Sequence, residues 1–271
     1  MHGAGNDYIY IDARQGKEIV KNPEELSIKM SNRHFGVGSD GIVLIMNSEI
    51  ADYRMRMFNA DGSEAGMCGN ASRCVARYLY DMGITDKEDI SLETKSGIKY
   101  LKVINSELDN FRVRVDMDEP KIIPSEIPVI ATTHKDVEIP TSQGIFKATC
   151  VSMGNPHAVI FIEDVDNWTI EAIGREIETH ELFPENTNVE FAQIVNSSEI
   201  KMRVWERGSG ETLACGTGAC ATLVAANIQG LASKCATIKL LGGDVEVEWN
   251  AKTNRVFLSG GAEWVFEGTW L

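Results

Sequence analysis

The sequence predicts an α+β fold made of two pseudo-symmetric halves, each a mainly antiparallel, barrel-like sheet around a central helix. A thirty-residue segment occurs twice without a gap, at residues 54–83 and 201–230, 147 positions apart, and six of its thirty pairs are identical. Both copies also share one order of patterns: an alternating strand, a polar loop, Cys-Gly and a helix. These two observations indicate related halves, which we place at 1–117 and 118–259.

Alternation of polar and apolar residues predicts strands at 53–58, 111–117, 201–205 and 244–249. The stretch 119–140 holds four of the seven prolines and no helical pattern, so we expect the crossover between the halves there. The repeat extends further, since Gly-Asn at 5–6 and again at 154–155 precedes an apolar run.

Four helices are expected. The first begins at Asn22, where Pro23 suits the first helical position and Glu25 completes a capping-box pair, and it stops at Gly36. The second lies near 169–180, with isoleucines on one face. The third and fourth follow Cys68 and Cys215, and the fourth is apolar nearly all round, which predicts burial against a sheet.

The composition limits the function. The chain has 271 residues, 43% of them hydrophobic, and a net charge of −14 at pH 7, which argues against a nucleic-acid surface. No apolar run approaches a membrane span and the N-terminus is not a signal peptide, so we expect a cytoplasmic enzyme with a small-molecule substrate and reduced thiols. The histidines lack metal-ligand spacing and no lysine lies in a cofactor-anchoring context, so neither a metal nor a cofactor is expected.

Cys68 and Cys215 are the strongest candidates for chemistry. A free cysteine is most often a small buried hydrophobe. Both of these, however, precede a glycine at a helix start, where the helix N-terminus stabilises a thiolate and lowers its pKa. Two equivalent thiols suit a reaction that removes a proton from one face of a carbon and returns one to the other. The remaining cysteines lack this setting and are interpreted as structural: Cys74, Cys150, Cys220 and Cys235.

Glycine-rich segments accompany both thiols. Gly69-Asn70 and Gly216-Thr217 leave backbone N–H groups open at two helix starts, which can hold a carboxylate, although ordinary helix entry would look the same. His157 and Glu206 lie in polar loops from which either could tune a thiol. Residues 36–41 match a dinucleotide-binding GxGxxG, but a helix precedes them and a strand follows, so we interpret them as a turn.

Six motifs together resemble one known family, the diaminopimelate epimerases, which epimerise an amino acid without a cofactor. The motifs are HGAGNDY (2–8), GVGSDG (36–41), FNADGSEAGMCGNASRC (58–74), GNPH (154–157), ENTNVEF (185–191) and WERGSGETLACGTGAC (205–220). The resemblance implies an active site between two similar halves, with segment 260–271 returning to the first. It also implies a homodimer, supported by an aromatic residue at Phe266.

The resemblance implies that Cys68 and Cys215 are the two acid/base thiols and that His157 and Glu206 modulate them. The implied substrate contacts come from Asn6, Asn59, Gly69, Asn70, Asn155, Asn188, Glu206, Arg207, Gly216 and Thr217. The chain departs from the family at Gly41, where some members carry Gln. Family members also have a short strand before the His-Gly motif, whereas this sequence begins at Met1.

The chemistry of diaminopimelate fits these residues, because the molecule carries two amino-acid heads. Arg207 can pair bidentately with the distal carboxylate, and the asparagines can bind an ammonium–carboxylate head. Helix-end donors on the reacting carboxylate would stabilise the developing carbanion, while one cysteine starts as thiolate and the other as thiol.

The expected reaction is therefore the interconversion of LL- and meso-2,6-diaminopimelate, which supplies lysine and peptidoglycan precursors. Alternatives are a racemase of proline, hydroxyproline or histidine, a non-catalytic module that captures amino acids, and a thiol peroxidase. Arg207 and the asparagines favour a substrate with a second charged head over the racemases. The duplicated anion-binding helix starts have no purpose in a peroxidase.

Overall fold

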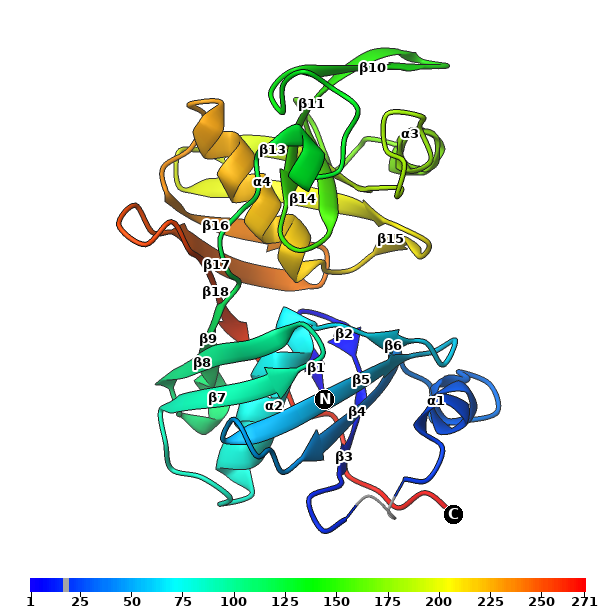
Figure 1. The fold of residues 1–271 in the computed structure, drawn as a ribbon, viewed down its shortest axis with the longest axis vertical. Helices are drawn as coiled ribbons and strands as arrows, with labels where there is room; N and C mark the ends of the chain where they lie inside the picture. Colours follow the sequence, from blue (N-terminus) through cyan, green and yellow to red (C-terminus); the bar gives the residue numbers. More distant parts are fainter. Residues whose placement is uncertain (17–19) are drawn as a thin grey trace. The chain divides into compact units, whose positions relative to one another are not determined.

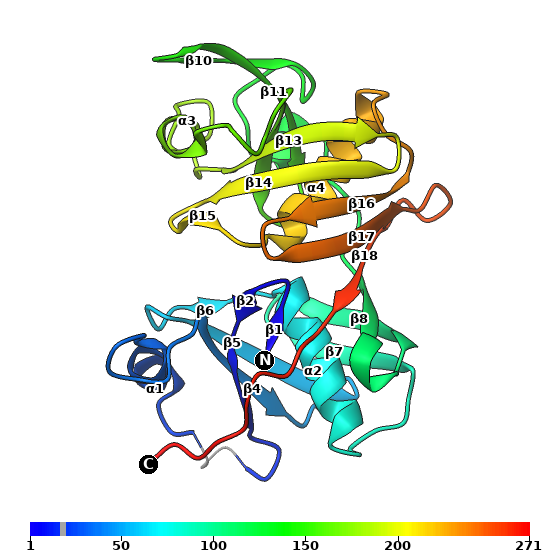
Figure 2. The ribbon, with the colours of Figure 1, turned by 180° about the vertical axis from the view of Figure 1, so that it is seen from behind.

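The computed structural model describes residues 1–16 and 20–271, which form two compact units. Unit 1 comprises Met1–Asp116 and Ser259–Leu271, and unit 2 comprises Met117–Leu258. Both combine β-sheet with helices, as Figures 1 and 2 show, so the predicted α+β class is confirmed. Among the described residues, no helix is long and apolar enough to span a membrane.

Unit 1 contains a sheet in the order β9-β8-β7-β5-β4-β3, in which β3 runs parallel to β4 and β5 parallel to β7. Two of its strands, β5 and β9, are the strands predicted at 53–58 and 111–117. Helix α1 packs on β4 and β5, and α2 packs on β8 and β9. The elements are β1 (His2–Gly3), β2 (Asn6–Asp7), β3 (Ile9–Asp12), α1 (Pro23–Ser31), β4 (Gly41–Met46), β5 (Tyr53–Asn59), β6 (Glu64–Ala65), α2 (Gly69–Asp81), β7 (Asp89–Thr94), β8 (Gly97–Asn105), η1 (Leu108–Asn110) and β9 (Arg112–Asp116).

Unit 2 repeats this topology. Its sheet order is β10-β11-β12-β13-β14-β16-β17, with β12 parallel to β13 and β14 parallel to β16. Strands β14 and β17 are those predicted at 201–205 and 244–249, and β18 continues into unit 1. The elements are η2 (Pro124–Glu126), β10 (Val137–Thr141), β11 (Gly144–Ser152), β12 (Pro156–Phe161), α3 (Ile170–Glu178), β13 (Asn188–Asn196), β14 (Glu199–Glu206), β15 (Gly210–Thr212), α4 (Gly216–Ile228), β16 (Cys235–Leu240), β17 (Gly243–Trp249) and β18 (Val256–Gly261).

The internal repeat has the same structure in both units. Arg56 of β5 pairs with Glu64 of β6 at 2.7 Å, and Arg203 of β14 pairs with Glu211 of β15 at the same distance. These four residues are two of the identical pairs of the sequence repeat. Helices α2 and α4 both have 13 residues and begin directly after a cysteine. The interpretation of the two segments as structural equivalents is therefore confirmed.

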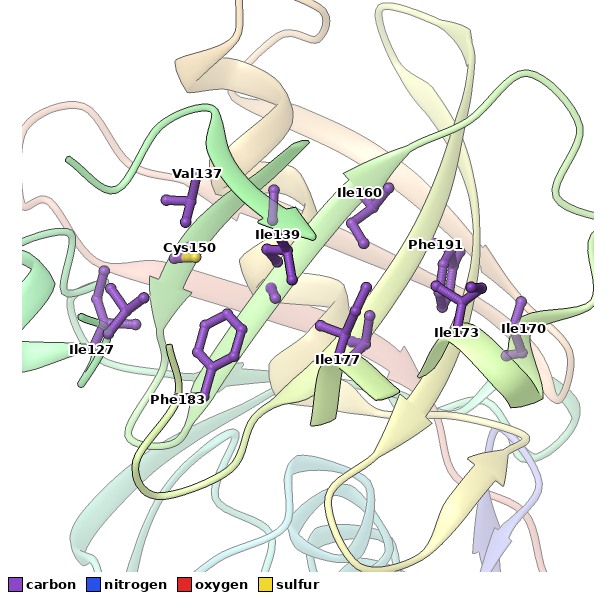
Figure 3. Packing of buried hydrophobic residues seen from close by; sticks show 14 of the residues in the cluster. Ile127, Val137, Ile139, Cys150, Ile160, Ile170, Ile173, Ile177, Phe183 and Phe191 are labelled. Carbon is purple, nitrogen blue, oxygen red and sulfur yellow. The ribbon is translucent and has the colours of Figure 1, made fainter. Parts of the chain in front are cut away.

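The sheet of unit 2 is covered on both faces. On one face, Ile170, Ile173 and Ile177 of α3 join an apolar cluster with side chains of β10 to β13, as Figure 3 shows. Helix α4 contacts β11, β12, β13, β14, β16 and β17, and its residues 218–226 are all buried, as its apolar sequence predicts. Since side chains alternate along a strand, His157 and Glu190 point away from the cluster that holds Ala158 and Val189.

Helix α1 begins as predicted, with Asn22 at the N-cap and Pro23 at the first helical position. The capping-box expectation is wrong. The Asn22 backbone carbonyl accepts from the Leu26 N–H at 3.0 Å, but its side chain accepts no hydrogen bond from the helix. The side-chain Nδ2 instead donates to Glu25 Oε2 at 3.0 Å.

The predicted stop of α1 at Gly36 is also wrong, because the helix ends at Ser31. The Asn32 side-chain oxygen accepts from the backbone N–H groups of His34 (2.9 Å) and Phe35 (2.8 Å). This local turn competes with continued helix and ends it early.

Candidate functional site

Cys68 occupies the N-cap of α2, with an extended backbone (φ −138°, ψ 121°). Its sulfur accepts from the backbone N–H of Ala71 at 3.5 Å and donates to Asn6 Oδ1 at 3.3 Å. The predicted loop-to-helix junction is thus confirmed, with Gly69 as the first helical residue. The contact with Asn6 brings the first motif of the chain to this thiol.

Asp40 orients Asn6. Its carboxylate accepts from Asn6 Nδ2 at 2.7 Å, which leaves the Asn6 amide oxygen facing the thiol. Burial, and next the Asp7 charge, raise the pKa of Asp40, and the hydrogen bond from Asn6 partly offsets this. Asn70 Nδ2 also donates to Asn6 Oδ1 at 3.4 Å. The buried Asn70 Oδ1 has no hydrogen-bond partner among the described residues and offers an acceptor for an ammonium group.

Cys215 occupies the equivalent N-cap of α4, followed by Gly216. Its sulfur accepts from the backbone N–H of Gly218 at 3.3 Å and lies 3.4 Å from Thr217 Oγ1. Asn155 Nδ2 donates to Thr217 Oγ1 at 3.3 Å. Asn155 and Thr217 thus correspond to the Asn6–Asn70 pair of unit 1.

A chain of buried polar groups continues from Asn155. His157 Nε2 lies 3.0 Å from Asn155 Oδ1, and His157 Nδ1 lies 2.6 Å from Glu190 Oε1. Glu206 also lies within hydrogen-bond reach of the Cys215 thiol and accepts from the Thr212 hydroxyl. Burial raises the pKa of Glu206, and the hydrogen bonds from Thr212 and Cys215 partly offset the increase. The structure therefore gathers both predicted modulators in unit 2.

The expectation that a helix start lowers the pKa of the thiol is wrong for Cys215. Burial, and next the nearby charges of Glu206 and Glu190, raise its pKa well above the ordinary value. The hydrogen bonds from Thr217 and Gly218 act in the opposite direction but are outweighed. Cys215 is therefore a thiol in the unliganded protein near neutral pH.

Asn188 and Arg207 share one loop network. Asn188 Nδ2 donates to the Pro156 carbonyl at 2.9 Å, and its Oδ1 accepts from the Arg207 N–H at 3.0 Å. The exposed Arg207 guanidinium donates to the Glu185 carbonyl at 2.9 Å. Asn188 thus ties the loop after β14 to the start of β12.

Asn59 and Gly41 are paired across β5 and β4 in unit 1. The Asn59 amide donates to Ser63 Oγ at 3.0 Å within the following turn. Gly41 has φ 157°, and a Cβ there would lie 2.0 Å from the Phe58 carbonyl oxygen. The Gln found at this position in some family members would require a different backbone. Residues 36–40 lie between α1 and β4, as the interpretation of 36–41 as a turn after a helix and before a strand expects, and Gly41 already belongs to β4.

Comparisons with known proteins cover almost the whole chain. The family model described as diaminopimelate epimerase matches residues 1–123 and 149–265. The chain belongs to the diaminopimelate epimerase family. A curated diaminopimelate epimerase of Methanococcus maripaludis is 53% identical over 270 residues, covering 99% of this chain and 97% of that protein. One of Acetivibrio thermocellus is 53% identical over 274 residues, covering 99% and 96%.

Solved structures with similar folds are more distant in sequence. A Bacillus anthracis phenazine biosynthesis protein of the PhzF family has a TM-score of 0.70 at 16% identity, covering 96% of this chain and 91% of that one. A hydroxyproline epimerase from Agrobacterium vitis has a TM-score of 0.64 at 16% identity, covering 96% and 86%. These two structures support the fold only.

Three carboxylates beside the family residues were missed by the sequence analysis: Asp40, Glu178 and Glu190. The sequence could have indicated Glu190, because this charged residue interrupts the apolar strand 189–192. Asp40 lies in the motif dismissed as a dinucleotide site. Glu178 ends an ordinary amphipathic helix and gave no signal.

Proposed function

We propose that this chain interconverts LL- and meso-2,6-diaminopimelate without a cofactor, with Cys68 and Cys215 as the two acid/base thiols. The observation that carries the proposal is that each thiol is the N-cap of an equivalent 13-residue helix. Membership of the diaminopimelate epimerase family supports the substrate.

In the proposed reaction, one cysteine thiolate removes the α-hydrogen as a proton, and the C–H bond breaks. The electron pair stays on the α-carbon and spreads into the adjacent carboxylate. The other cysteine donates its S–H proton to the opposite face of the carbon, so the roles of thiolate and thiol are exchanged. No oxidant or other reactant is required.

The surroundings of Cys215 support its role as the starting acid. Its raised pKa keeps the proton on the sulfur before reaction. In the direction in which Cys215 is the acid, Cys68 is the base, and it acts as a thiolate once it has lost the S–H proton that faces Asn6 Oδ1. After Cys215 has donated its proton, the Thr217 hydroxyl and Gly218 N–H can hydrogen-bond to the new thiolate.

The remaining family residues are proposed to hold the substrate. The N–H groups at the starts of α2 and α4, from Gly69, Asn70, Gly216 and Thr217, suit the reacting carboxylate. The exposed guanidinium of Arg207 suits the distal carboxylate. The other proposed substrate contacts are Asn6, Asn59, Asn155, Asn188 and Glu206.

Incubation with LL-diaminopimelate in deuterated water tests the proposal. The expected result is formation of the meso isomer with one deuterium at the inverted α-carbon. Proline, 4-hydroxyproline and histidine form the comparison set. Exchange on one of these and none on diaminopimelate would show a racemase instead, and binding without exchange would show a capture module.

We also propose a cytoplasmic homodimer that serves lysine and peptidoglycan precursor synthesis. Phe266 and Trp270 of the C-terminal segment are largely exposed, with relative exposures of 60% and 46%, which supports an aromatic contact there. Light scattering at micromolar concentration should give the mass of a dimer, and Phe266→Ala should lower it. Cell fractionation tests the location.

A further inference from the structure

Glu190 on β13 is a completely buried carboxyl group that the proposed reaction does not use. Its Oε1 lies 2.6 Å from His157 Nδ1, and both side chains have zero exposure. In the part of the chain that the structure describes, its Oε2 meets no hydrogen-bond partner. Its charge raises the pKa of Cys215 directly, and its hydrogen-bonded contact with His157 adds a second route to that thiol.

The contacts of His157 set the positions of the hydrogens. Nε2 lies 3.0 Å from Asn155 Oδ1, and a carbonyl oxygen can only accept, so Nε2 carries a hydrogen. Nδ1 faces Glu190 Oε1, and their short contact requires a second hydrogen between ring and carboxyl. Glu190 therefore holds the ring with Nε2 as the donor to Asn155.

The hydrogen bonds between His157 and Cys215 run in the same donor-to-acceptor direction. With its oxygen facing the ring, Asn155 turns its Nδ2 to Thr217 Oγ1, 3.3 Å away. Thr217 Oγ1 then acts as acceptor, and its own hydrogen is available for the Cys215 sulfur, 3.4 Å away. Every link thus donates towards the sulfur.

Packing holds the carboxyl in place. A Cβ at Gly218 would lie 2.7 Å from Glu190 Oε1 and 3.3 Å from the Cys215 sulfur. The glycine that donates its N–H to the sulfur thus also makes room for the carboxyl. The fully buried carboxyl thus lies against the start of α4, where a larger residue than glycine would not fit.

We propose that Glu190 is a positioning residue that, through His157, Asn155 and Thr217, directs a hydrogen bond to the Cys215 sulfur. That hydrogen bond stabilises the thiolate that Cys215 becomes after donating its proton, and it acts against the direct repulsion between the thiolate and the Glu190 charge. The predicted effect of Glu190 on catalysis rests on the proposed function. The charged or titratable groups around the thiol are Glu206 on β14, Glu190 on β13 and His157 on β12.

The test compares two near-isosteric variants. Glu190→Gln can still donate to His157 Nδ1, whereas Glu190→Met cannot bond to it. Alkylation of Cys215 by iodoacetamide is followed against pH by peptide mass spectrometry, in a Cys68→Ser background. Both variants lack the carboxylate charge, so the expected result is a Cys215 curve that lies at higher pH in Glu190→Met than in Glu190→Gln.

Cys68 provides the matched control. In a Cys215→Ser background, the alkylation curve of Cys68 should not move in either Glu190 variant. Equal displacement at both thiols would show general loosening. Cys215 curves that coincide in Glu190→Met and Glu190→Gln would mean that Glu190 acts on the thiol only through its charge. Either outcome overturns the proposal.

Kinetics provide the catalytic measurement. With diaminopimelate, Glu190→Met should lower kcat by about tenfold, the effect of one lost hydrogen bond to a charged group, and leave KM within about twofold. Glu190→Gln should recover most of the loss. Wild type without epimerase activity would refute the proposed function only, because the alkylation test needs no substrate. An epimerase whose Cys215 curve is the same in Glu190→Met and Glu190→Gln would refute this inference alone.

A measurement on the wild type remains decisive if Glu190→Met does not fold. Nitrogen-15 spectra of the histidine rings, with His157 assigned by its loss in His157→Gln, report which ring nitrogen carries hydrogen. Hydrogen on Nε2 supports the direction of the chain. An Nε2 without hydrogen would reverse the direction of donation between His157 and Asn155 and would overturn the proposal.

Discussion

The indole N–H of Trp205 donates to the Glu178 carboxylate at 2.7 Å, and the other carboxylate oxygen accepts from the Gly208 N–H at 2.7 Å. One carboxylate at the end of α3 thus fixes both sides of the loop that carries Glu206 and Arg207. A Cβ at Gly174 of the same helix would lie 2.6 Å from Trp205 Cβ, so helix and loop are closely packed. The fold positions these two family residues through α3.

Glu178→Ala should therefore impair both stability and substrate binding. Loss of the two hydrogen bonds to a buried carboxylate should lower the free energy of unfolding by about 2–3 kcal/mol. The freed loop should raise KM for diaminopimelate more than it lowers kcat. Urea denaturation and initial rates measure these effects. Glu171→Ala, an exposed change on the same helix, is the control, and equal effects in the two variants would contradict the role given to Glu178.

The duplicated segment was predictable because its signals are local. Gly83 and Gly230, an identical pair, both have positive φ (62° and 74°) just after their helices, a conformation that glycine adopts freely. The two cysteines precede helices in both copies. Such features depend on neighbours along the chain, so one sequence reveals them.

The three missed carboxylates depend on contacts between distant segments. Asp40 bonds to Asn6, 34 residues away, and Glu178 to Trp205, 27 residues away. Glu190 meets His157 because β13 runs parallel to β12 in one register. The raised pKa of Cys215 has the same origin, since two carboxylates from other strands surround a thiol that sequence places only at a helix start.

Removal of either thiol tests the two-base assignment. Cys68→Ala and Cys215→Ala should each lower epimerisation by at least about 10²-fold, because each removes one proton-transfer group. Cys74→Ala and Cys235→Ala are the matched controls and should keep most activity. Formation of meso product from the LL isomer is the measurement. Full activity in either of the first two variants would rule the assignment out.

Arg207→Ala tests recognition of the distal carboxylate. Since the side chain is exposed and donates to one backbone carbonyl, the variant should unfold at nearly the wild-type urea concentration. Loss of the charge pair should weaken substrate binding by about 2–5 kcal/mol. Arg207→Lys keeps the charge without the bidentate geometry and should be intermediate. Normal turnover by Arg207→Ala would favour a racemase of simpler amino acids.

The raised pKa of Glu206 predicts a pH dependence of stability. A carboxyl group that holds its proton more tightly in the folded protein stabilises the fold only while protonated. Its contribution is present below the ordinary value of 4.5 and is lost as pH rises through the raised folded value. The free energy of unfolding of wild type should therefore fall relative to Glu206→Gln as pH increases from 4.5. If the free energies of unfolding of the two proteins changed in parallel with pH, the raised pKa of Glu206 would be contradicted.

Mild oxidation tests whether Cys68 and Cys215 can reach one carbon, as the two-base proposal requires. Thiols that act on opposite faces of one atom should be able to meet when the substrate is absent, and a disulfide needs about 2 Å between the sulfurs. Oxidation without substrate should link the two and stop catalysis, and dithiothreitol should restore it. Bound diaminopimelate should protect the enzyme by lying between the sulfurs. Peptide mapping identifies the bond. Inactivation that instead follows Cys74, Cys150, Cys220 or Cys235, with Cys68 and Cys215 still reduced, would show that the two thiols do not serve one substrate carbon.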